Sequence, residues 1–478
     1  MAAALAVCGT LVQCERPPYV QRDKDADAQS KDDADAQESW LVIRQAWCVC
    51  VDAQGIIIHV GPLAEAGEIV NGAQKVIRLE KHQMLCPGFI DTHIHAPQYS
   101  YTGTATDKPL MSWLQDYTFP AEKALQDVEK AAEVYERIVA RTLRCGTTTA
   151  MYFGTLHNAS SQVLADTCFR LGQRALVGKV SMDRNGQQGY QEADTKSALQ
   201  DAENFVRNLK QSQAGKAGMA LPVLTPRFIP TCTPELLRGL GDLARQYDCN
   251  VQSHISESLD EVEFSAALHP GEGSDAILFD AAGLLRKGAV MAHGVHMSDA
   301  DFALLKARGA AIAHCPLSNF FFAHGYLPVA KLLKQGVLMG LGTDVAGGYS
   351  PSMFNAMRSA VLASKAGAIQ ARTAHLDGDH IIDYRHAFFL ATLGGAQALD
   401  IDDKVGKLQV GMQFDALILD ADAPGTNIDV FPRDSIEDVF QKLCTLGDDR
   451  NVIRVFTPVL LQAYMQKRAK LETETSKE

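Results

Sequence analysis

From about residue 85 onward, short apolar runs alternate with stretches whose apolar residues recur at helical spacing. The stretches at 131–146 and 234–248 are predicted helices of this kind. Such alternation is typical of βα units with parallel strands, and eight units predict a (β/α)8 TIM-like barrel. The eight expected strands are residues 84–95, 146–153, 174–182, 221–228, 249–256, 288–295, 310–316 and 336–344.

The two ends of the chain follow the alternation of strands instead, at 5–14, 39–62 and 405–422. We expect them to pair into one small β-sandwich domain, because the two ends of a barrel can meet. The predicted division is 1–84 and 401–478 for this domain, with the barrel of 85–400 between them.

Residues 15–39 interrupt the first β region with polar sequence in which DADAQ occurs twice. A stretch of this composition buries little apolar surface, so we predict a disordered insert. A partner-binding segment is the alternative.

Composition narrows the function classes. The chain has 478 residues, 46% of them hydrophobic, and a formal net charge of −12. A soluble globular protein is expected, with neither nucleic acid nor an acidic membrane surface as its main partner. No apolar run is long enough to predict a transmembrane helix, and the apolar N-terminal stretch is predicted to be a first strand. Eleven cysteines without paired spacing indicate reduced thiols and a cytoplasmic location.

Polar residues recur where the predicted strands end. In a (β/α)8 barrel the chemistry lies at the carboxyl ends of the strands, which all face the same side. Histidines at four strand ends, with an acid on the last, are too many to attribute to chance. The residues at these ends are His93, His95, Arg227, His254, His293, His314 and Asp344.

A metal site accounts for this set. Side chains alternate along a strand, so His93 and His95 face the same side. Imidazole and carboxylate suit zinc, which in a catalytic site keeps one position for water, although ligand type alone leaves iron open. Zinc gives such a water a pKa of about 7 and so provides hydroxide at neutral pH. The candidate ligands for one zinc ion are His93, His95, His254 and Asp344.

Two residues near these ligands have alternative interpretations. Glu257 follows His254 by three residues and is placed to carry protons from water to a leaving amine. Equally, it is an acid in the first turn of the helix expected to begin here. His293 is either a fifth ligand or holds the attacking water by a hydrogen bond, and we favour the second.

Longer motifs resemble a known family. "PGFIDTHIHA", "HCPLSN" and "GLGTDVAGG" occur in this order and resemble the metal-dependent amidohydrolase superfamily. More narrowly, "DTHIHAPQYSYTG", "WLQDYTFPAE", "QSHISE" and "GTDVAGGYS" resemble the guanine deaminase family. Such motifs extend from about residue 85 to 455, and residues 15–39 have no counterpart.

This resemblance implies a reaction and a set of roles. The reaction is hydrolysis of guanine to xanthine and ammonia by a zinc-activated hydroxide, in a homodimeric enzyme of purine catabolism or salvage. It implies Glu257 as proton shuttle, His293 as an aid to the attacking water, and Asp344 as both ligand and proton acceptor. The implied zinc ligands are the four named above, and the implied substrate contacts are Gln98, Arg227, Phe228, His254 and Glu257.

Physical reasons accompany the substrate contacts. Arginine and an amide can hydrogen-bond the carbonyl and ring nitrogens of a purine, and a phenylalanine can pack on its face. Without the family resemblance, we would interpret Arg227 as one half of an ion pair and Phe228 as a core residue.

Other polar residues are left without a catalytic role. Binuclear amidohydrolases use a carboxylated lysine, typically on the fourth strand, whereas Lys179 lies on the third predicted strand, so one metal is expected. His314 is predicted to support the site from behind the ligands. His157, His296 and His324 are predicted loop residues.

Two rival functions remain. One is another amidohydrolase, such as an adenine- or adenosine-type or triazine deaminase, against which Gln98 and Arg227 favour a carbonyl-bearing purine. The other is an inactive scaffold that keeps the barrel. Occupation of every expected ligand position disfavours it.

Overall fold

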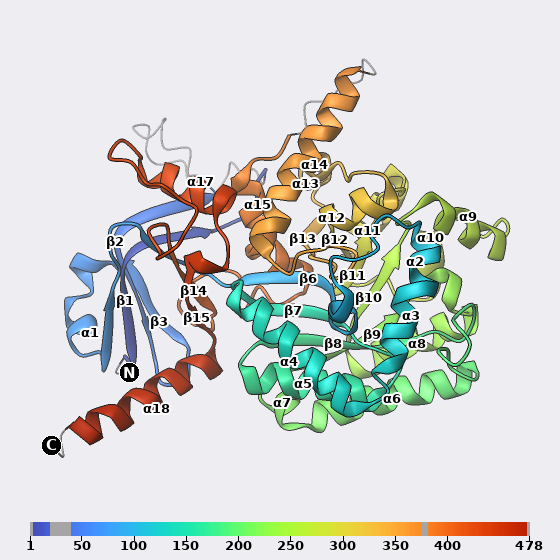
Figure 1. Ribbon diagram of the computed structural model, residues 1–478, viewed down its shortest axis with the longest axis horizontal. Coiled ribbons are helices and arrows are strands. Elements are labelled where there is room, and N and C mark those ends of the chain that lie inside the picture. Colours follow the sequence, from blue (N-terminus) through green and yellow to red (C-terminus); the bar gives the residue numbers. More distant parts are fainter. Residues whose placement is uncertain (1–2, 20–39, 374–380, 476–478) are drawn as a thin grey trace.

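The computed structural model describes residues 3–19, 40–373 and 381–475 (Figure 1). Its larger part is an eight-stranded parallel sheet in which β6 to β13 follow one another in chain order. The expected fold class, an α/β barrel with a smaller β unit, is therefore confirmed. The barrel strands are β6 (Phe89–His95), β7 (Thr147–Phe153), β8 (Arg174–Ser181), β9 (Ala220–Pro226), β10 (Asn250–Ile255), β11 (Ala289–His293), β12 (Ala311–His314) and β13 (Leu338–Leu341).

The first and last barrel strands meet at their carboxyl ends. Asp344 N donates to His93 O at 2.9 Å, and His95 N donates to Val345 O at 3.0 Å. These two bonds place the side chains that follow β13 directly beside those that end β6.

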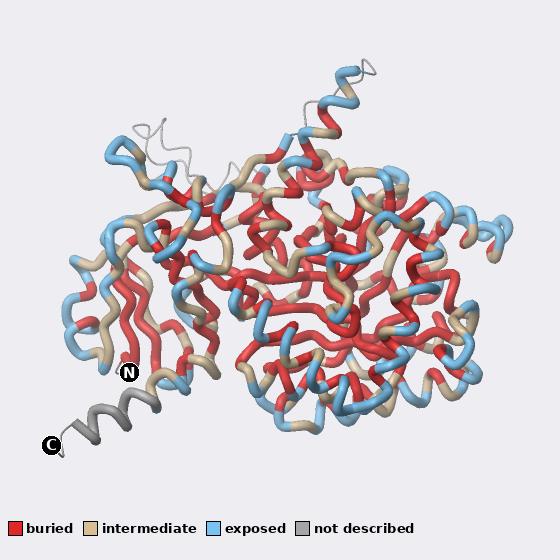
Figure 2. Tube along the Cα trace, in the orientation of Figure 1, coloured by how far each residue is buried: buried red, intermediate tan, exposed pale blue. Residues whose placement is uncertain are grey.

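The barrel strands are almost entirely buried. Every residue of β6, β7 and β8 is buried, and Figure 2 shows the strands as the buried centre of this part of the molecule. Parallel sheets require helices on their outer face, which explains why the strands are continuous apolar runs. Helices α4, α5, α6 and α8 lie around the strands (Figure 1).

Local signals set the ends of these helices. Thr233 accepts from Leu236 N at the start of α8, with Pro234 in the first helical position. Asp194 and Ser197 form a capping box at the start of α6. The helices are α1 (Gly67–Asn71), α2 (Leu110–Trp113), α3 (Phe119–Ala124), α4 (Val128–Arg144), α5 (Asn158–Leu171), α6 (Thr195–Gln211), α7 (Gln213–Lys216), α8 (Pro234–Tyr247), α9 (Leu259–Leu268), α10 (Asp275–Ala281), α11 (Asp299–Arg308), α12 (Pro316–Ser318), α13 (Val329–Gln335), α14 (Met353–Thr373), α15 (Tyr384–Ala391), α16 (Leu393–Ala398), α17 (Ile436–Leu446) and α18 (Pro458–Thr475).

Shorter helical turns connect these elements. Two of them are wide turns of the π type, Leu114–Thr118 and Asn319–Ala323. The tighter turns are Leu63–Glu65, Ala96–Tyr101, Ile229–Thr231 and Asp449–Asn451.

Both ends of the chain pair in a second, seven-stranded sheet beside the barrel (Figure 1). β14 is antiparallel to β5, which joins the C-terminal part of the chain to the N-terminal part, as expected from the sequence. The strands are β1 (Leu5–Cys14), β2 (Leu41–Val51), β3 (Ile57–Pro62), β4 (Lys75–Arg78), β5 (Gln83–Pro87), β14 (Ala416–Asp420) and β15 (Val452–Phe456).

The single strand expected over 84–95 is wrong, because the structure divides it between the two sheets. β5 ends at Pro87 in the small sheet, and β6 starts at Phe89 in the barrel. Gly88 separates them. A Cβ atom there would lie 2.1 Å from Thr148 Oγ1, so only glycine fits where the chain passes from one sheet to the other.

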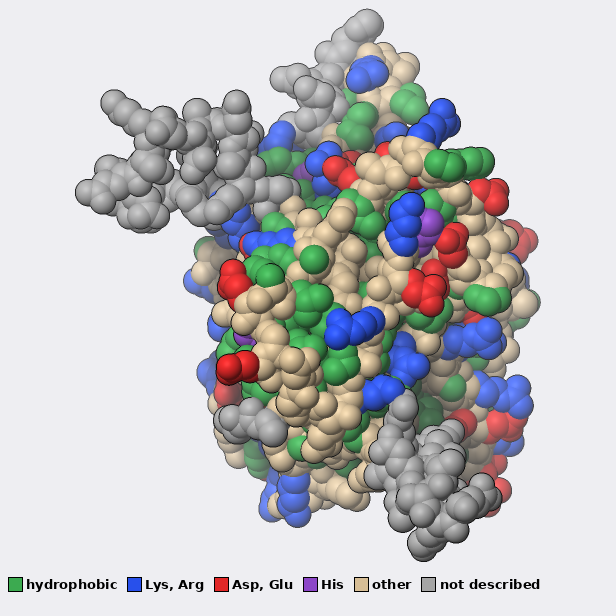
Figure 3. All heavy atoms as spheres, turned by 90° about the vertical axis from the view of Figure 1, so that its left-hand side faces the viewer, with side chains coloured by type: hydrophobic (Ala, Val, Ile, Leu, Met, Phe, Trp, Pro, Cys, Tyr) green, Lys and Arg blue, Asp and Glu red, His purple; other side chains and the backbone are tan. Residues whose placement is uncertain are grey.

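The remaining predictions outside the site have different outcomes. All eleven cysteines are buried and free, as predicted. Both DADAQ repeats lie outside the described residues, and the domain boundaries stay predictions. None of the described helices is long and apolar enough to cross a membrane. On the face shown in Figure 3, positive and negative side chains are interspersed with apolar ones, as on a surface that faces water.

Candidate metal centre and substrate pocket

The four predicted metal ligands come together at the carboxyl end of the barrel. His95 Nε2 lies 3.1 Å from His254 Nε2. Asp344 Oδ1 lies 3.2 Å from His93 Nε2 and 3.5 Å from His95 Nε2. Side chains from β6, from β10 and from the segment after β13 therefore share one small space.

These separations fit a metal ion. In a tetrahedral zinc site with bonds of about 2.0–2.1 Å, ligand atoms lie about 3.3 Å from one another. The observed separations of 3.1–3.5 Å have that size. His93 Nε2 is also buried without a hydrogen-bond partner among the described residues. An unpaired buried polar atom is unfavourable, and a metal would satisfy it. The residues present thus fit a divalent cation.

Hydrogen bonds behind the rings fix which nitrogen faces this space. His254 Nδ1 lies 2.6 Å from Arg227 O, which can only accept, so this nitrogen carries the proton. His293 Nδ1 donates in the same way to Asn319 Oδ1 at 3.0 Å. Their Nε2 lone pairs therefore face the site, as a ligand requires. Burial also lowers the pKa values of the ligand histidines well below their usual range, which keeps the rings neutral, at His93, His95 and His254.

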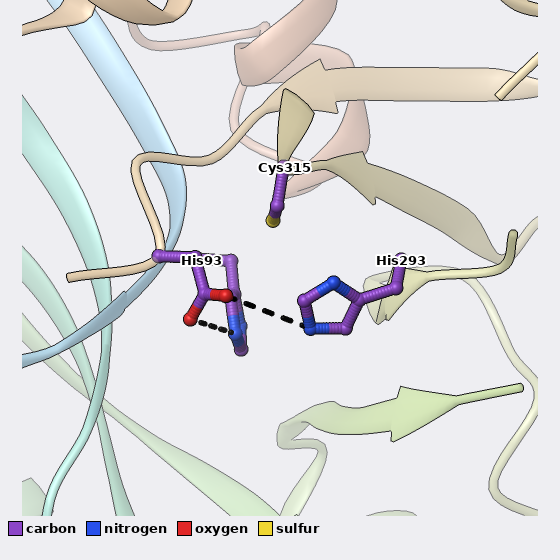
Figure 4. A group of neighbouring side chains, drawn as sticks. His93, His293 and Cys315 are labelled. Atoms are coloured by element: carbon purple, nitrogen blue, oxygen red, sulfur yellow. Dashed lines mark ion pairs between the residues drawn. The ribbon is translucent and has the colours of Figure 1, made fainter. Parts of the chain in front are cut away.

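Figure 4 shows His93, His293 and Cys315 directed toward the same space from different strands. His293 Nε2 lies 3.8 Å from Asp344 Oδ2, slightly farther than the predicted ligands lie from that carboxylate. Cys315 was not predicted. Its thiol donates to Ala313 O at 3.5 Å, and burial raises the pKa of the thiol well above its usual value. Its sulfur lies within 4.8 Å of ligand atoms of His93, His293 and Asp344, so Cys315 is a neighbour of the site that the sequence did not indicate.

A buried carboxyl and a glycine set the spacing between β6 and the segment after β13. Asp91 accepts from Thr343 N at 3.0 Å, from the Thr343 hydroxyl, and from His93 N at 3.2 Å. Burial raises the pKa of Asp91 to about 7. A Cβ atom on Gly342 would lie 2.9 Å from His93 Cβ and 2.8 Å from Cys315 Sγ. A larger residue at 342 would push the two strand ends apart.

The backbone is strained at three of these strand ends. Ser256, His293 and Asp344 have φ values of 45°, 77° and 48°, in the left-handed region that favours glycine. Residues held there cluster at functional sites, where the surroundings fix them. For Ser256 the fixing group is the buried Asp275, which accepts from its backbone N at 3.1 Å and its hydroxyl at 3.0 Å.

Glu257 lies two residues before Leu259, the first residue of α9. The helix is capped by Ser258, and the acid that serves its first turn is Glu261, which accepts from Glu257 N at 2.8 Å and from Ser258 N at 3.4 Å. The role in the first turn of a helix, which the sequence offered as the alternative for Glu257, is therefore filled by Glu261. The Glu257 carboxyl is left free to face the site.

The environment of the Glu257 carboxyl is suited to proton transfer. One of its oxygens lies 3.5 Å from His293 Nε2, and the other accepts from Ser318 Oγ at 3.5 Å. Burial and the neighbouring Asp344 carboxylate raise the pKa of Glu257 well above its usual value. Groups with such perturbed pKa values in a cleft are candidates for acid–base chemistry.

One pocket contains all the residues predicted to contact the substrate. Gln98, Arg227 and Phe228 line it together with the metal-site residues. Its other lining is apolar, and the rings of Trp113 and Phe322 pack against each other there with centroids 4.8 Å apart. The full lining is His95, Gln98, Leu110, Trp113, Leu114, Arg227, Phe228, His254, Glu257, His293, Ser318, Phe322, Asp344 and Gly347.

Arg227 is both ion-paired and part of the pocket lining, so the two interpretations offered for it are compatible. Its partner is Glu122 of α3, at 2.7 Å from NH1 and 3.2 Å from NH2. Glu122 was not among the residues predicted from the sequence. Glu122 follows no barrel strand, so the only feature of the sequence that pointed to it was its place in the "WLQDYTFPAE" motif. Phe153 was missed for a different reason, because it ends the barrel strand β7 but is apolar, and only polar residues were considered at the strand ends. It packs against the rings of His95 and His254, each with centroids 4.6 Å away.

The residues left without a catalytic role lie apart from the ligands. Lys179 lies on the third barrel strand, as predicted, and pairs with Glu192. His314 is buried, burial lowers its pKa to about 3, and neither ring nitrogen has a hydrogen-bond partner among the described residues. Its supporting role stays a prediction. His296 contacts Ala323 O at 3.3 Å in a loop. His157 and His324 lie at helix termini.

The chain is similar to known proteins over most of its length. Residues 84–457 match the amidohydrolase family. Guanine deaminase from Rattus norvegicus is 43% identical over 386 residues, which cover 80% of this chain and 83% of that protein. Guanine deaminase from Escherichia coli is 32% identical over 408 residues, 84% of this chain and 89% of that protein.

Solved structures agree with these relatives. A guanine deaminase from C. acetobutylicum, with guanine bound in its active site, superposes with a TM-score of 0.80 and 30% identity, over 95% of this chain and 98% of that one. A guanine deaminase from Bradyrhizobium japonicum superposes with a TM-score of 0.84 and 25% identity, over 96% and 98% of the two chains. The chain belongs to the guanine deaminases of the amidohydrolase family.

Proposed function

We propose that this chain hydrolyses guanine to xanthine and ammonia, with one zinc ion held by the four ligands described above. One observation carries the proposal: three of the four candidate ligands, a buried carboxyl and two hydrogen-bond donors for a purine line the same pocket, and the fourth ligand, His93, adjoins the other two histidines. Relatives of similar length that share the family are guanine deaminases, which supports the choice of substrate.

The reaction replaces an amine by a hydroxyl at C2 of the base. When bound, zinc lowers the pKa of its water to about 7 and so supplies hydroxide at neutral pH. The water oxygen forms a bond to C2, and the bond between C2 and the amine breaks. The second proton of water ends on the amine, which leaves as ammonia, and the 2-hydroxy product is a tautomer of xanthine.

Two carboxyl groups are placed to move these protons. Glu257 gives its proton to a ring nitrogen, which makes C2 more electrophilic, and takes the proton back from that nitrogen when ammonia leaves. Asp344 accepts the proton that water releases and returns it to the amine. His293, with its Nε2 directed between Glu257 and Asp344 at 3.5 and 3.8 Å, holds the attacking water by a hydrogen bond.

Substrate binding uses the remaining pocket residues. The N–H groups of Arg227 and Gln98 donate to the carbonyl oxygen and ring nitrogens of guanine. Phe228 packs against the face of the base, and the apolar side chains opposite exclude water. Exclusion of water strengthens each hydrogen bond in the pocket.

Zinc as the native metal, a homodimer and a cytoplasmic location belong to the same proposal. Elemental analysis of protein purified without added metal distinguishes zinc from iron, and two metals per chain would overturn the single-metal site. Light scattering measures the oligomeric state directly, and a monomeric mass would contradict the proposed homodimer.

The decisive experiment is a substrate panel on the metal-loaded wild type. Conversion of guanine to xanthine is followed by absorbance, and ammonia is measured in parallel for adenine, adenosine and a triazine. We expect guanine to have the highest kcat/KM. Faster turnover of another substrate would identify a different amidohydrolase, and no ammonia from any of them with zinc bound would indicate an inactive scaffold.

A further inference from the structure

Glu122 is the centre of a buried hydrogen-bond network beside the pocket. It is 0% exposed, and its carboxylate accepts four hydrogen bonds. Arg227 donates from NH1 at 2.7 Å and from NH2 at 3.2 Å, Gln98 Nε2 donates at 3.0 Å, and Tyr190 OH donates at 2.7 Å. Two carboxylate oxygens offer about four acceptor sites, so this carboxylate is fully used.

This network fixes the direction of the Gln98 amide. Gln98 Oε1 accepts from Ala346 N at 3.2 Å while Nε2 donates to Glu122. A half-turn of the amide would place its oxygen against the Glu122 carboxylate and its NH2 group against the Ala346 N–H. The amide is therefore held so that its second N–H remains for the pocket.

The same carboxylate fixes Arg227. The two bonds form the paired geometry that orients a guanidinium most strongly, and the group also lies over the ring of Phe119 at 4.9 Å. Glu122 takes one N–H from each terminal nitrogen, which leaves three of the five donors of the guanidinium. Both polar residues on this wall of the pocket thus present N–H groups, and both depend on Glu122 for their direction.

We propose that Glu122 is a positioning residue that makes the enzyme select purines with a carbonyl at C6, by fixing the Arg227 and Gln98 donors toward that oxygen. The inference rests on the proposed function, since it concerns the same pocket and substrate. A wall of oriented donors binds a carbonyl oxygen and leaves those donors unpaired when the carbonyl is absent. Sites built to hydrogen-bond a substrate group discriminate strongly against analogues that lack it.

Tyr190 links Glu122 to a further support. Its segment is held by Glu192, which pairs with Lys179 of β8 and accepts from Met182 N at 2.7 Å. Lys179, which has no place in the metal site, thus helps to keep the Tyr190 hydroxyl against Glu122. Removal of that hydroxyl should weaken selection in the same direction as loss of the Glu122 charge, but less.

The test compares guanine with 2-aminopurine, which keeps the amine at C2 and has hydrogen in place of the C6 carbonyl. Ammonia release gives kcat/KM for both substrates, and their ratio measures selection. Glu122→Gln should lower this ratio by about 10- to 150-fold, the factor expected for one charge-assisted hydrogen bond. Tyr190→Phe should lower it by a smaller factor.

Two control variants make the same chemical changes elsewhere. Asp415→Asn neutralises another buried acid, paired with Arg174 at 3.3 Å, and Tyr152→Phe removes another buried hydroxyl, which donates to Gln173 at 2.8 Å. Both should leave the ratio at the wild-type value. A merely structural role of Glu122 would lower kcat/KM for both substrates equally, and an unchanged ratio in Glu122→Gln would overturn the proposal.

Two outcomes remain to be separated. If Glu122→Gln does not fold, Tyr190→Phe decides, and an unchanged ratio in that variant also overturns the proposal. If metal-loaded wild type does not deaminate guanine at all, the proposed function itself is wrong. The proposal for Glu122 fails on its own only if the wild type deaminates guanine and the ratio is unchanged in the variants.

Discussion

Substitution of Glu257 by glutamine tests the proposed proton transfer with little change of shape. The carboxyl is 6% exposed, and its contacts with Ser318 Oγ and His293 Nε2 are both 3.5 Å long. An amide of the same size retains contacts with both groups. We therefore expect Glu257→Gln to fold and bind metal as the wild type does, while losing the group that carries a proton.

The expected loss follows from the chemistry and the burial. Proton transfer by a positioned side chain contributes about 10²- to 10⁴-fold to rate, which corresponds to about 2.7–5.4 kcal/mol at 1.36 kcal/mol per factor of ten. Because the side chain is almost completely buried, bulk water has poor access as a substitute. We expect kcat to fall by about 10³-fold or more, with a much smaller change in KM.

The assay is the absorbance change from guanine to xanthine, measured with metal content determined on the same samples. Glu263→Gln is the matched control, since it makes the same chemical change on an exposed residue of α9 and should be fully active. Full activity in Glu257→Gln would show that Glu257 does not transfer a proton in catalysis. Loss of metal in proportion to activity would show that it acts through the metal site instead.

Three further predictions concern the metal, the hydrogen bonds by which Asp275 holds Ser256 next to Glu257, and the stability of the fold. Removal of metal by a chelator should abolish activity. It should also lower the unfolding temperature, because a metal present at 100 times its Kd stabilises the fold by about 2.7 kcal/mol. An unchanged unfolding temperature in calorimetry would contradict the proposed metal site. Asp275→Asn should lower kcat by about tenfold with metal retained, because the amide holds Ser256 less firmly than the carboxylate does and Glu257, the next residue, is displaced. Steady-state kinetics that match the wild type would show that Asp275 does not position Glu257. Asp415→Ala should destabilise the fold by about 3–5 kcal/mol in denaturant unfolding, because it leaves the buried Arg174 unpaired. Glu133→Ala, which breaks an exposed pair, should cost far less, and equal losses would show that burial does not decide the effect.

Strand positions in the barrel were predictable because parallel strands are buried on both faces and so form continuous apolar runs. The same property explains the one error. The run at 84–90 is apolar across the change of sheet, since Met84 and Cys86 of β5 pack into the core shared with the barrel and β6 continues into the barrel itself. Hydrophobicity alone does not show that the chain changes sheet, and the steric demand at Gly88 depends on Thr148, which lies 60 residues away.

The convergence of the four candidate ligands was predictable for a related reason, because the barrel brings the ends of its strands to one side whatever the loops do. Glu122 obeys no such rule. It lies in α3, within an insertion between β6 and α4, and its contacts with Arg227 and Gln98 depend on how that insertion folds over the barrel. Positions that follow from topology are therefore accessible from sequence, while positions that follow from the path of an insertion are not.

The strained backbone at Ser256, His293 and Asp344 marks the limit of local reasoning most clearly. Local preference alone would place glycine at such φ values, and each strained residue costs about 1–3 kcal/mol. The chain instead has residues with functional groups there and holds them by long-range bonds, such as Asp275 to Ser256 and His93 O to Asp344 N. Natural sequences are locally consistent except where function requires otherwise. Ten non-glycine residues of the described chain have a positive φ, and three of them meet at the carboxyl end of one barrel. It is this convergence, rather than strain at any single position, that agrees with chemistry at this end.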